Sequence, residues 1–536
     1  MALLNLPVEL LQRIIAETIP DSIENVAITC STLYRASQIY LEQHNKLRRR
    51  YRHFSYSKLS RTSPSDIRAE EEWDICTKDT GLRIVNAVDF ILAIIRNPLI
   101  PRYVETADLK ASFGVRNFDP GDNSQGTGPL FPRVRGEADI EVLREFLRTS
   151  PYLEQTGSNP ETWMEGIQND VVGHAEVFLL TLLTHVRELA LPAAWGELTL
   201  RPFKSGEEGE EEDEHRSDRS VIWPMLDHIV WRANEPGVKD AGLSKLDILR
   251  PFTGSGYDCR NAMTLNTPFL AIGSLREAYI GGCIALEDGY TGIPFHPEYS
   301  TYSPRLEKLE LVGCTFEPWE VRVLLSRMAN LKCLHFAYEV KWHGCGMSCD
   351  TGHILDTIME CTGETLEELS AWMMEHWGST GRTLTDMKGF RRLKSLEIDS
   401  FMFMGPEFRK DDVEDFDLTD APNVWPVEEI AAPRMVDMLP PSLESLRILV
   451  QGNDGDDRSA QIAKCLRALF DGFPQHRQKL LPKLQEVVVE IVGTNVDLNL
   501  QREMEAQGAK IYVREGLEVQ PSFLTEFYTR FDVEAE

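Results

Sequence analysis

The chain has 536 residues, of which 42% are hydrophobic and 26% are charged, and its net charge at pH 7 is −29. This length leaves room for a large core or several domains, and the composition is typical of a soluble globular protein. The acidic charge argues against binding to nucleic acid or to anionic membrane, because both need an excess of lysine and arginine. We therefore expect no nucleic acid and no membrane among its partners.

The cysteine content and the N-terminal sequence indicate the cellular compartment in which the protein is expected. Ten cysteines are scattered along the chain, which is too few for a disulfide scaffold at this length. The apolar N-terminus is interrupted by Glu9, Arg13 and Glu17, and no basic region precedes it, so it does not read as a signal peptide. The longest apolar runs, such as residues 90–95, are too short to cross a bilayer. We expect a cytoplasmic and/or nuclear protein.

Three helical patterns occupy the first fifty residues. The first covers residues 6–15, where apolar side chains fall at the spacing that places them on one stripe, with a proline in the first turn. Residues 19–22 break this pattern, a second follows over residues 23–27, and a third begins at residue 31. Such a short segment is below the size at which one core is comfortably stable. We expect it to complete its core against another surface.

The segment of residues 1–50 resembles an F-box, with its Leu-Pro start, its helix spacing and the break between the first two helices. In that family the helices insert into a Skp-type adaptor, which connects the chain to a cullin–RING ubiquitin ligase. The alternative is a plain N-terminal helical cap on the following domain. The adaptor-binding residues that the resemblance implies are Leu6, Pro7, Leu10, Leu11, Ile14, Ile15, Val26, Leu33 and Tyr34.

A basic run between residues 44 and 61 has two interpretations. It is a nuclear-import signal or a patch for an acidic partner, or else it is the solvated end of the third helix, where the helix dipole favours cations. We favour the second interpretation, because runs of charged residues usually lie on solvent-exposed surface. Residues 51–80 are expected to form a linker.

A strongly apolar helical pattern follows over residues 82–95 and is stopped by Pro98. Residues 100–109 then read as a short strand. This helix–Asn-Pro–strand unit resembles the entry repeat of fungal F-box proteins that carry leucine-rich-repeat-like domains. Two more helical patterns lie at residues 140–147 and 177–183.

A hexapeptide of the form L-x-x-L-x-L, with other apolar residues tolerated, recurs nine times. The second and third apolar residues occupy alternate positions of a short strand, so both point into the core and the residue between them points out. One repeat cannot bury its own apolar face, so several must stack into a solenoid. The copies begin at Val186, Leu243, Leu275, Leu306, Leu331, Leu366, Leu393, Leu443 and Leu484.

These patterns predict an α/β protein. A small N-terminal three-helix unit, which resembles an F-box, is expected to be followed over residues 81–536 by an irregular leucine-rich-repeat-like solenoid, with parallel strands on the concave face and helices on the convex face. Loop insertions are expected near residues 112–137, 200–220 and 404–432, the second of which holds an acidic run.

Two further features belong to this solenoid. The glycine–cysteine pairs at Gly282-Cys283 and Gly313-Cys314 resemble those of the cysteine-containing subtype of leucine-rich repeats. Residues 510–513 are expected to supply a final capping strand.

The strongest candidate for chemistry is a run of four potential zinc ligands, His343, Cys345, Cys349 and His353. Zinc favours tetrahedral Cys and His ligands, but this spacing matches no common zinc module, so we favour an exposed loop with two free thiols. The chain carries no nucleophile elbow, P-loop or dinucleotide-binding glycine motif. We expect no cofactor, no metal and no enzymatic activity.

Taken with the resemblance, the layout predicts a substrate-recognition subunit of a Skp–cullin–F-box ubiquitin ligase. Its partners would be a Skp-family adaptor, through it a cullin–RING ligase, and a target protein held by the repeats. One alternative is a leucine-rich-repeat scaffold with no ligase role. A second is an enzyme or metalloprotein centred on residues 343–353.

Overall fold

The structure is a computed structural model. The chain divides into two compact units, Met1–Phe252 and Thr253–Glu536, which are described one at a time. The structure describes residues 5–56, 84–110, 136–169, 171, 173–198, 221–238, 240–256, 259–286, 293–340, 351–375, 386–400, 402, 434–451, 456–492, 498–514 and 520–531.

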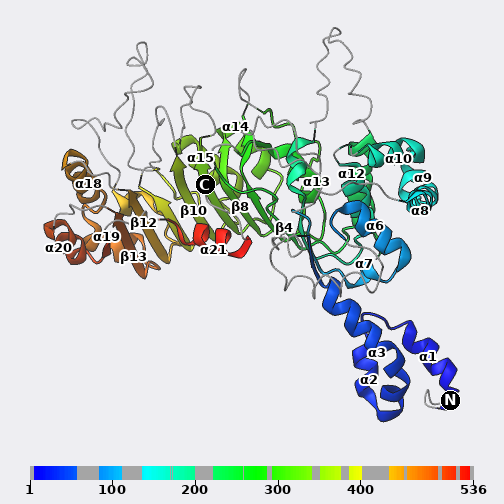
Figure 1. Cartoon of the computed structure of the whole chain (residues 1–536). Coiled ribbons are helices and arrows are strands. Elements are labelled where there is room, and N and C mark those ends of the chain that lie inside the picture. The colour runs from blue at the N-terminus through cyan, green and yellow to red at the C-terminus, as the bar shows by residue number, and fades with distance from the viewer. Residues whose placement is uncertain are drawn as a thin grey trace, which may run out of the picture. The chain divides into compact units, whose positions relative to one another are not determined.

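The first unit opens with the three expected helices, α1 (Val8–Ala16), α2 (Ile23–Thr29) and α3 (Ser31–Tyr51) (Figure 1). Helices α1 and α2 both pack against α3 and against each other. Successive turns of α1 bury Leu11 and Ile15, and Ile23 of α2 is fully buried. The helical periodicity in the sequence is therefore confirmed, including the break between α1 and α2.

Four short parallel strands follow among the described residues of the first unit, in the order β1-β2-β3-β4. The strands are β1 (His53–Ser55), β2 (Thr106–Asp108), β3 (Glu188–Ala190) and β4 (Ile248–Arg250). Residues 53–55, expected to lie in a linker, thus form the first strand of the sheet, directly after α3. Residues 57–80 of the expected linker lie outside the described residues.

The helices of this unit are α6 (Ala87–Arg96), α7 (Ile100–Tyr103), α8 (Glu137–Arg148), α9 (Pro151–Thr156), α10 (Pro160–Gln168), α11 (His174–Leu182), the 3-10 helix η2 (Ala193–Glu197) and α12 (Ile222–Asn234). The expected strand at residues 100–109 is wrong in its first half, where Ile100–Tyr103 is the helical turn α7. Pro101 in the first turn of α7 and the buried Tyr103 explain this, since proline suits a helix start and apolar residues alone do not distinguish a short strand from a turn.

The described part of the second unit holds eight parallel main strands in the order β6-β8-β9-β10-β11-β12-β13-β14. Two short strands, β5 (Asn261–Ala262) and β7 (Cys283–Ala285), continue beside the end of β8. The main strands are β6 (Glu277–Gly281), β8 (Lys308–Phe316), β9 (Cys333–Glu339), β10 (Glu368–Glu375), β11 (Ser395–Asp399), β12 (Ser445–Gln451), β13 (Glu486–Val492) and β14 (Lys510–Arg514). The predicted α/β architecture of repeated parallel strands with interleaved helices is confirmed, and residues 510–513 do form the last strand.

The strand register follows the hexapeptide. Seven residues that each hold the second apolar position lie opposite one another on successive strands, and so do those that hold the third. Because side chains alternate along a strand, one shared register puts all of these positions on the core side. The second-position residues are Ala278, Leu309, Leu334, Leu369, Leu396, Leu446 and Val487, and all are buried.

The copy that begins at Leu243 is wrong by three residues. Leu249, not Leu246, lies opposite Leu189 on the neighbouring strand, so Leu246 takes the first position and Ile248 is only half buried. The local sequence fits the hexapeptide whether it begins at Leu243 or at Leu246, and the pairing of β4 with β3 shows that it begins at Leu246. Leu243 instead sits in a turn with φ of 61° and donates its N–H to the carbonyl of Leu183.

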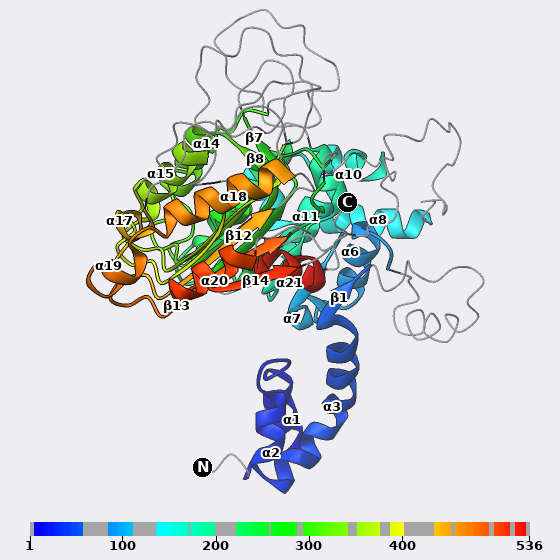
Figure 2. The same cartoon turned by 90° about the vertical axis from the view of Figure 1, so that its left-hand side faces the viewer.

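Helices cover the core side of the second unit. Met435 of α17 and Leu469 of α18 line one small space together with Leu396 and Ile448 of the strands. The helices of this unit are η5 (Met263–Asn266), α13 (Thr267–Leu270), α14 (Pro318–Leu325), α15 (Thr351–Thr362), α17 (Met435–Met438), α18 (Asp456–Leu469), α19 (Phe473–Leu480), α20 (Leu498–Ala506) and α21 (Ser522–Phe531). Figure 2 shows α15 and α19 on one side of the strands and α21 on the other.

Most of the three expected insertions, residues 112–137, 200–220 and 404–432, falls outside the described residues, apart from the start of α8 at Glu137. Among the helices that the structure does describe, none is both long and apolar enough to cross a membrane.

Candidate functional site

The first candidate site is the set of exposed apolar side chains on α1–α3, which we call the α1–α3 surface. Of the twelve exposed large hydrophobic side chains in the described part of the chain, six lie in these three helices, and Ile28 is 80% exposed. Exposed apolar side chains that are concentrated in one small helical unit are a common feature of interaction surfaces. The residues of this α1–α3 surface are Val8, Leu10, Ile14, Ile28, Tyr34 and Ile39.

The nine residues predicted to bind an adaptor divide by exposure. Leu10, Ile14, Tyr34 and Pro7 are exposed, and Leu6 and Val26 are half buried. The side chains of Leu11, Ile15 and Leu33 are buried within the helical unit, so they hold the helices together and do not offer surface.

Sequence reasoning missed Val8, Ile28 and Ile39 as surface residues. Ile28 follows directly after the buried Ala27, so on a helix it points about 100° away from the core stripe. The helical period of α2 could therefore have identified Ile28 as an outward-facing residue, but the F-box pattern did not include it.

The basic end of α3 is partly neutralised within the first unit. Arg48 pairs with Glu24 of α2, and the Arg52 guanidinium lies 3.0 Å from the Glu105 carboxylate. The His44 ring is buried, with its Nδ1 3.0 Å from the Tyr103 hydroxyl, and burial lowers the pKa of His44 below its usual value. These contacts agree with the interpretation of this run as the end of a helix.

The second candidate site is a row of polar side chains on the strand face away from the core of the second unit. The residue between the two core positions of each hexapeptide points to this face. We call this row the polar ladder: Tyr279, Glu310, His335, Ser370, Glu397 and Arg447.

His335 is the centre of one half of the polar ladder. Its Nδ1 lies 3.0 Å from Glu310, and its Nε2 lies 2.8 Å from Glu368 and 3.3 Å from the Cys333 sulfur. Burial opposes the charged imidazolium, but the hydrogen bonds to Cys333, Glu310 and Glu368 outweigh it and raise the pKa of His335 to about 11. The Lys308 ammonium, 2.9 Å from Glu310, completes the cluster.

Glu397 is the centre of the other half. The Ser370 hydroxyl donates to it at 2.8 Å, and Arg447 pairs with it while also reaching Glu490 at 2.8 Å. The carboxylates of Glu397 and Glu490 are largely buried, and a buried carboxylate is stable only with such donors.

Helix α21 lies across the polar ladder. The Ser522 N–H, at its first turn, donates to Glu397 at 3.3 Å, and the Phe523 ring centre lies 4.7 Å from that of His335. Arg530, at the other end of the helix, donates to the Tyr279 hydroxyl at 2.8 Å. The C-terminal helix therefore spans the strands from β11 to β6. Its buried side chains are Phe523, Leu524, Phe527 and Phe531.

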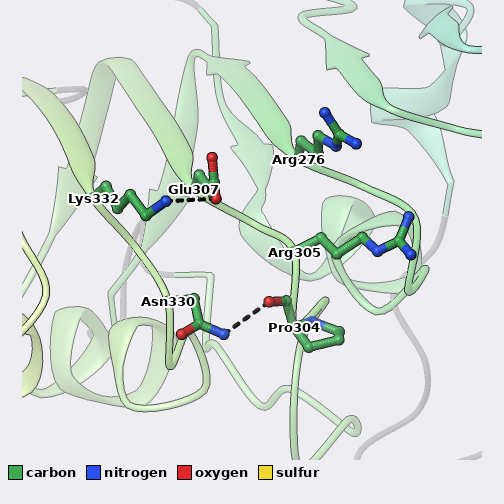
Figure 3. A pocket seen from close by; sticks show the side chains of 6 residues that line it. All are labelled: Arg276, Pro304, Arg305, Glu307, Asn330 and Lys332. Atoms are coloured by element: carbon green, nitrogen blue, oxygen red, sulfur yellow. Dashed lines mark hydrogen bonds and ion pairs between the residues drawn. The ribbon is translucent and has the colours of Figure 1, made fainter.

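An open pocket of about 430 Å³ lies where the chain enters β6, β8 and β9 (Figure 3). The cations at its rim are Arg276, Arg305 and Lys332, and the Lys332 ammonium pairs with Glu307 at 2.7 Å. Its walls are hydrophilic loop residues, among them Asn330, which donates to the carbonyl of Pro304 at 2.8 Å. With solvent-exposed cations and no buried polar group among these six residues, the pocket lacks the features of a ligand site.

Of the predicted zinc candidates, His343, Cys345 and Cys349 lie outside the described residues, and His353 is an exposed residue of α15. Comparison with protein-family models and with the sequences of curated proteins finds no match to this chain.

Proposed function

We propose that the chain is the substrate-recognition subunit of a Skp–cullin–F-box ubiquitin ligase. The α1–α3 surface would bind a Skp-type adaptor, and the strand-bearing units would hold a target protein. The chain would carry out no chemistry itself. It would contribute proximity, since holding a target lysine near a charged conjugating enzyme raises the effective concentration of the reactants.

The observation that carries this proposal is the α1–α3 surface. Fully burying a leucine, isoleucine or valine side chain yields roughly 1.5–3 kcal/mol, and five of the six residues of the α1–α3 surface are of these types. Their burial against a partner would therefore add substantial stability. A helical cap that served only the following domain would turn its apolar side chains toward that domain. On α1–α3, by contrast, one set of apolar residues forms the core of the helices and a second set remains exposed to solvent.

The test is co-purification with a Skp-type adaptor. We expect wild-type protein to bind the adaptor and the double variant Leu10→Asp with Ile14→Asp to lose binding, because two buried carboxylates would replace apolar contacts. Both side chains are exposed, so the variant should keep the wild-type circular dichroism. Val142→Asp, an exposed apolar residue on α8, is the matched control and should bind normally.

Retention of the adaptor by the double variant would refute the proposed binding surface. If wild-type protein binds no Skp-type adaptor, the protein is better described as a repeat scaffold without a ligase role.

The target would meet the second unit on the face of the polar ladder. Helix α21 covers the middle of this face, so α21 is itself part of the surface that a target encounters. Proximity labelling in cells with blocked proteasomes, comparing wild-type protein with the Leu10→Asp, Ile14→Asp variant, should enrich the target with the variant. The variant would still hold the target but would not deliver it to the ligase.

A further inference from the structure

We propose that Cys333, His335 and Glu368 form a zinc-binding site on the polar ladder. This inference does not depend on the ligase role, and it concerns different residues from the run at 343–353. It rests on the geometry of the three side chains, on the strand pattern that holds them and on the carboxylate behind the histidine.

The three potential ligand atoms converge on one point. The Cys333 sulfur, a ring nitrogen of His335 and a carboxylate oxygen of Glu368 all lie within 4.8 Å of one another. Zinc bonds of about 2.0–2.3 Å in a tetrahedral arrangement place ligand atoms about 3.3–3.6 Å apart. The observed separations of 3.3 Å and 2.8 Å from His335 Nε2 are close to this range, so small side-chain movements would admit the ion.

The backbone also suits a metal site. Cys333 and His335 are alternate residues of β9, so both point to the same face, and Glu368 lies directly opposite Cys333 on β10. Two ligands from one strand and one from its neighbour therefore share a rigid frame of paired strands. Thiolate, imidazole and carboxylate together are a typical zinc donor set.

More potential hydrogen-bond partners surround His335 Nε2 than a single N–H can satisfy. His335 Nε2 carries at most one proton, yet both Glu368 and Cys333 are within reach of it. One N–H can make one good hydrogen bond, whereas one zinc ion can bind all three atoms. On binding, the Cys333 thiol proton and the Nε2 proton would pass to solvent, as occurs when such ligands take up a metal.

Glu310 supplies the outer support that zinc-binding histidines usually have. It is buried and lies 3.0 Å from His335 Nδ1, where it accepts the N–H of the tautomer whose Nε2 faces the ion. With zinc bound, the two positive charges of the ion and that of Lys308 would balance the three negative charges of Cys333, Glu368 and Glu310. Three protein ligands leave one tetrahedral position for water.

The experiment measures metal bound to the full-length chain after removal of any affinity tag. We expect one zinc per chain by elemental analysis, and in cobalt-substituted protein a sulfur-to-cobalt charge-transfer band. Cys333→Ser should lose the band and the stoichiometric metal, whereas Cys361→Ser, a cysteine outside the cluster, should keep both. Glu310→Gln, which preserves shape but weakens the support of His335, should lower zinc affinity by about 10–100-fold.

Two results would overturn the proposal. One is wild-type protein that binds no stoichiometric zinc when titrated with the ion. The other is metal that survives in Cys333→Ser but disappears in the double variant Cys345→Ser with Cys349→Ser, which would assign the ion to the loop. If Cys333→Ser fails to fold, Glu368→Gln tests the same site, because the Glu368 side chain is about half exposed and its loss should be tolerated.

Discussion

Gly313 shows how a single residue permits the long strand β8. Its φ is 60°, and a Cβ built there would lie 2.5 Å from the Ser255 Cβ and 2.6 Å from a Glu339 carboxylate oxygen. Gly282 has the same conformation, with φ of 62°. At both positions the next residue is a fully buried cysteine, whose S–H donates to the carbonyl two residues before it. Glycine is needed here because the backbone turns and a neighbour approaches closely at the same point.

We expect Gly313→Ala to destabilise the protein by more than the roughly 1–3 kcal/mol of a left-handed alanine, because the methyl group would also clash. Urea unfolding of the purified protein checks this. Gly157→Ala is the control, since Gly157 has a similar φ of 66° but nothing within 4 Å of the added carbon. Equal losses in the two variants would contradict the role of close packing at Gly313.

His44 makes the first unit sensitive to acid. Burial lowers its pKa in the folded protein, so below about pH 6.5 the unfolded chain takes up a proton that the folded chain resists. Stability is therefore present above the unfolded pKa and is lost as the pH falls through it. His185 and His228 shift in the same direction, also through burial.

We expect His44→Gln to lose less stability between pH 7.5 and pH 5 than wild-type protein, because glutamine can accept from Tyr103 but cannot be protonated in this range. Thermal unfolding across this pH interval measures the difference. Parallel curves for the two proteins would show that His44 does not titrate on unfolding.

At the scale of elements, α21 joins distant parts of the second unit. Its aromatic residues at positions 523, 527 and 531 fall four apart and form one buried stripe. Nothing in the local sequence of α21 says which surface this stripe covers, because Glu397 is 125 residues away from Ser522 and Tyr279 is 251 residues away from Arg530. The helical period is readable from sequence, whereas the docking is not.

We expect Phe527→Ala to destabilise the second unit by about 3–5 kcal/mol, the usual cost of a cavity left by a buried aromatic side chain. Thr525→Ala, on the exposed side of the same helix, should change stability by less than about 0.5 kcal/mol. Denaturant unfolding monitored by tryptophan fluorescence compares the two. A small effect of Phe527→Ala would mean that α21 contributes little to the stability of this unit.

Two copies of the repeat, around β1 and β2, escaped the hexapeptide search because they carry aromatic or small residues in place of leucine, although β2 was expected as a strand. Tyr51, Phe54 and Tyr56 fill the three hexapeptide positions around β1, and all three are buried. Val104, Ala107 and Leu109 do the same around β2. These positions are selected by burial and by the volume of the space to be filled. A search based on a leucine pattern therefore recognises less readily the copies in which tyrosine, phenylalanine or alanine fills that space.

At the scale of the whole molecule, the repeat was the feature most readable from sequence. Seven consecutive copies in the second unit pair in one shared register, because alternation along a strand leaves only one phase that buries every apolar position. The candidate sites were less readable. Whether Leu10 or Leu11 faces solvent depends on how α1 packs on α3, and the proximity of Cys333 to Glu368 depends on the pairing of β9 with β10.

Repeat folds of this kind are stabilised by contacts between neighbouring repeats. A destabilising substitution in one repeat should therefore affect mainly that repeat and its two neighbours. We expect Val489→Ala, which removes buried methyl groups from β13, to speed amide hydrogen exchange in β12, β13 and β14 and to leave β6 and β8 unchanged. Hydrogen-exchange mass spectrometry reads each strand, and Lys483→Ala, an exposed site before β13, serves as control. Uniform acceleration across the second unit would show that it unfolds as one cooperative block.

Strand β14 ends the sheet of the second unit, and among the described residues no further strand pairs with it. Its edge therefore presents backbone donors and acceptors beside the exposed side chains of Tyr512 and Val513, with Lys510 at its start. Exposed strand edges template the addition of another strand, and a charged residue such as lysine is the usual protection against it. A further strand could therefore be added to this sheet. We expect that a designed repeat inserted after residue 514, in the same register as β13 and β14, would pair with the free edge of β14.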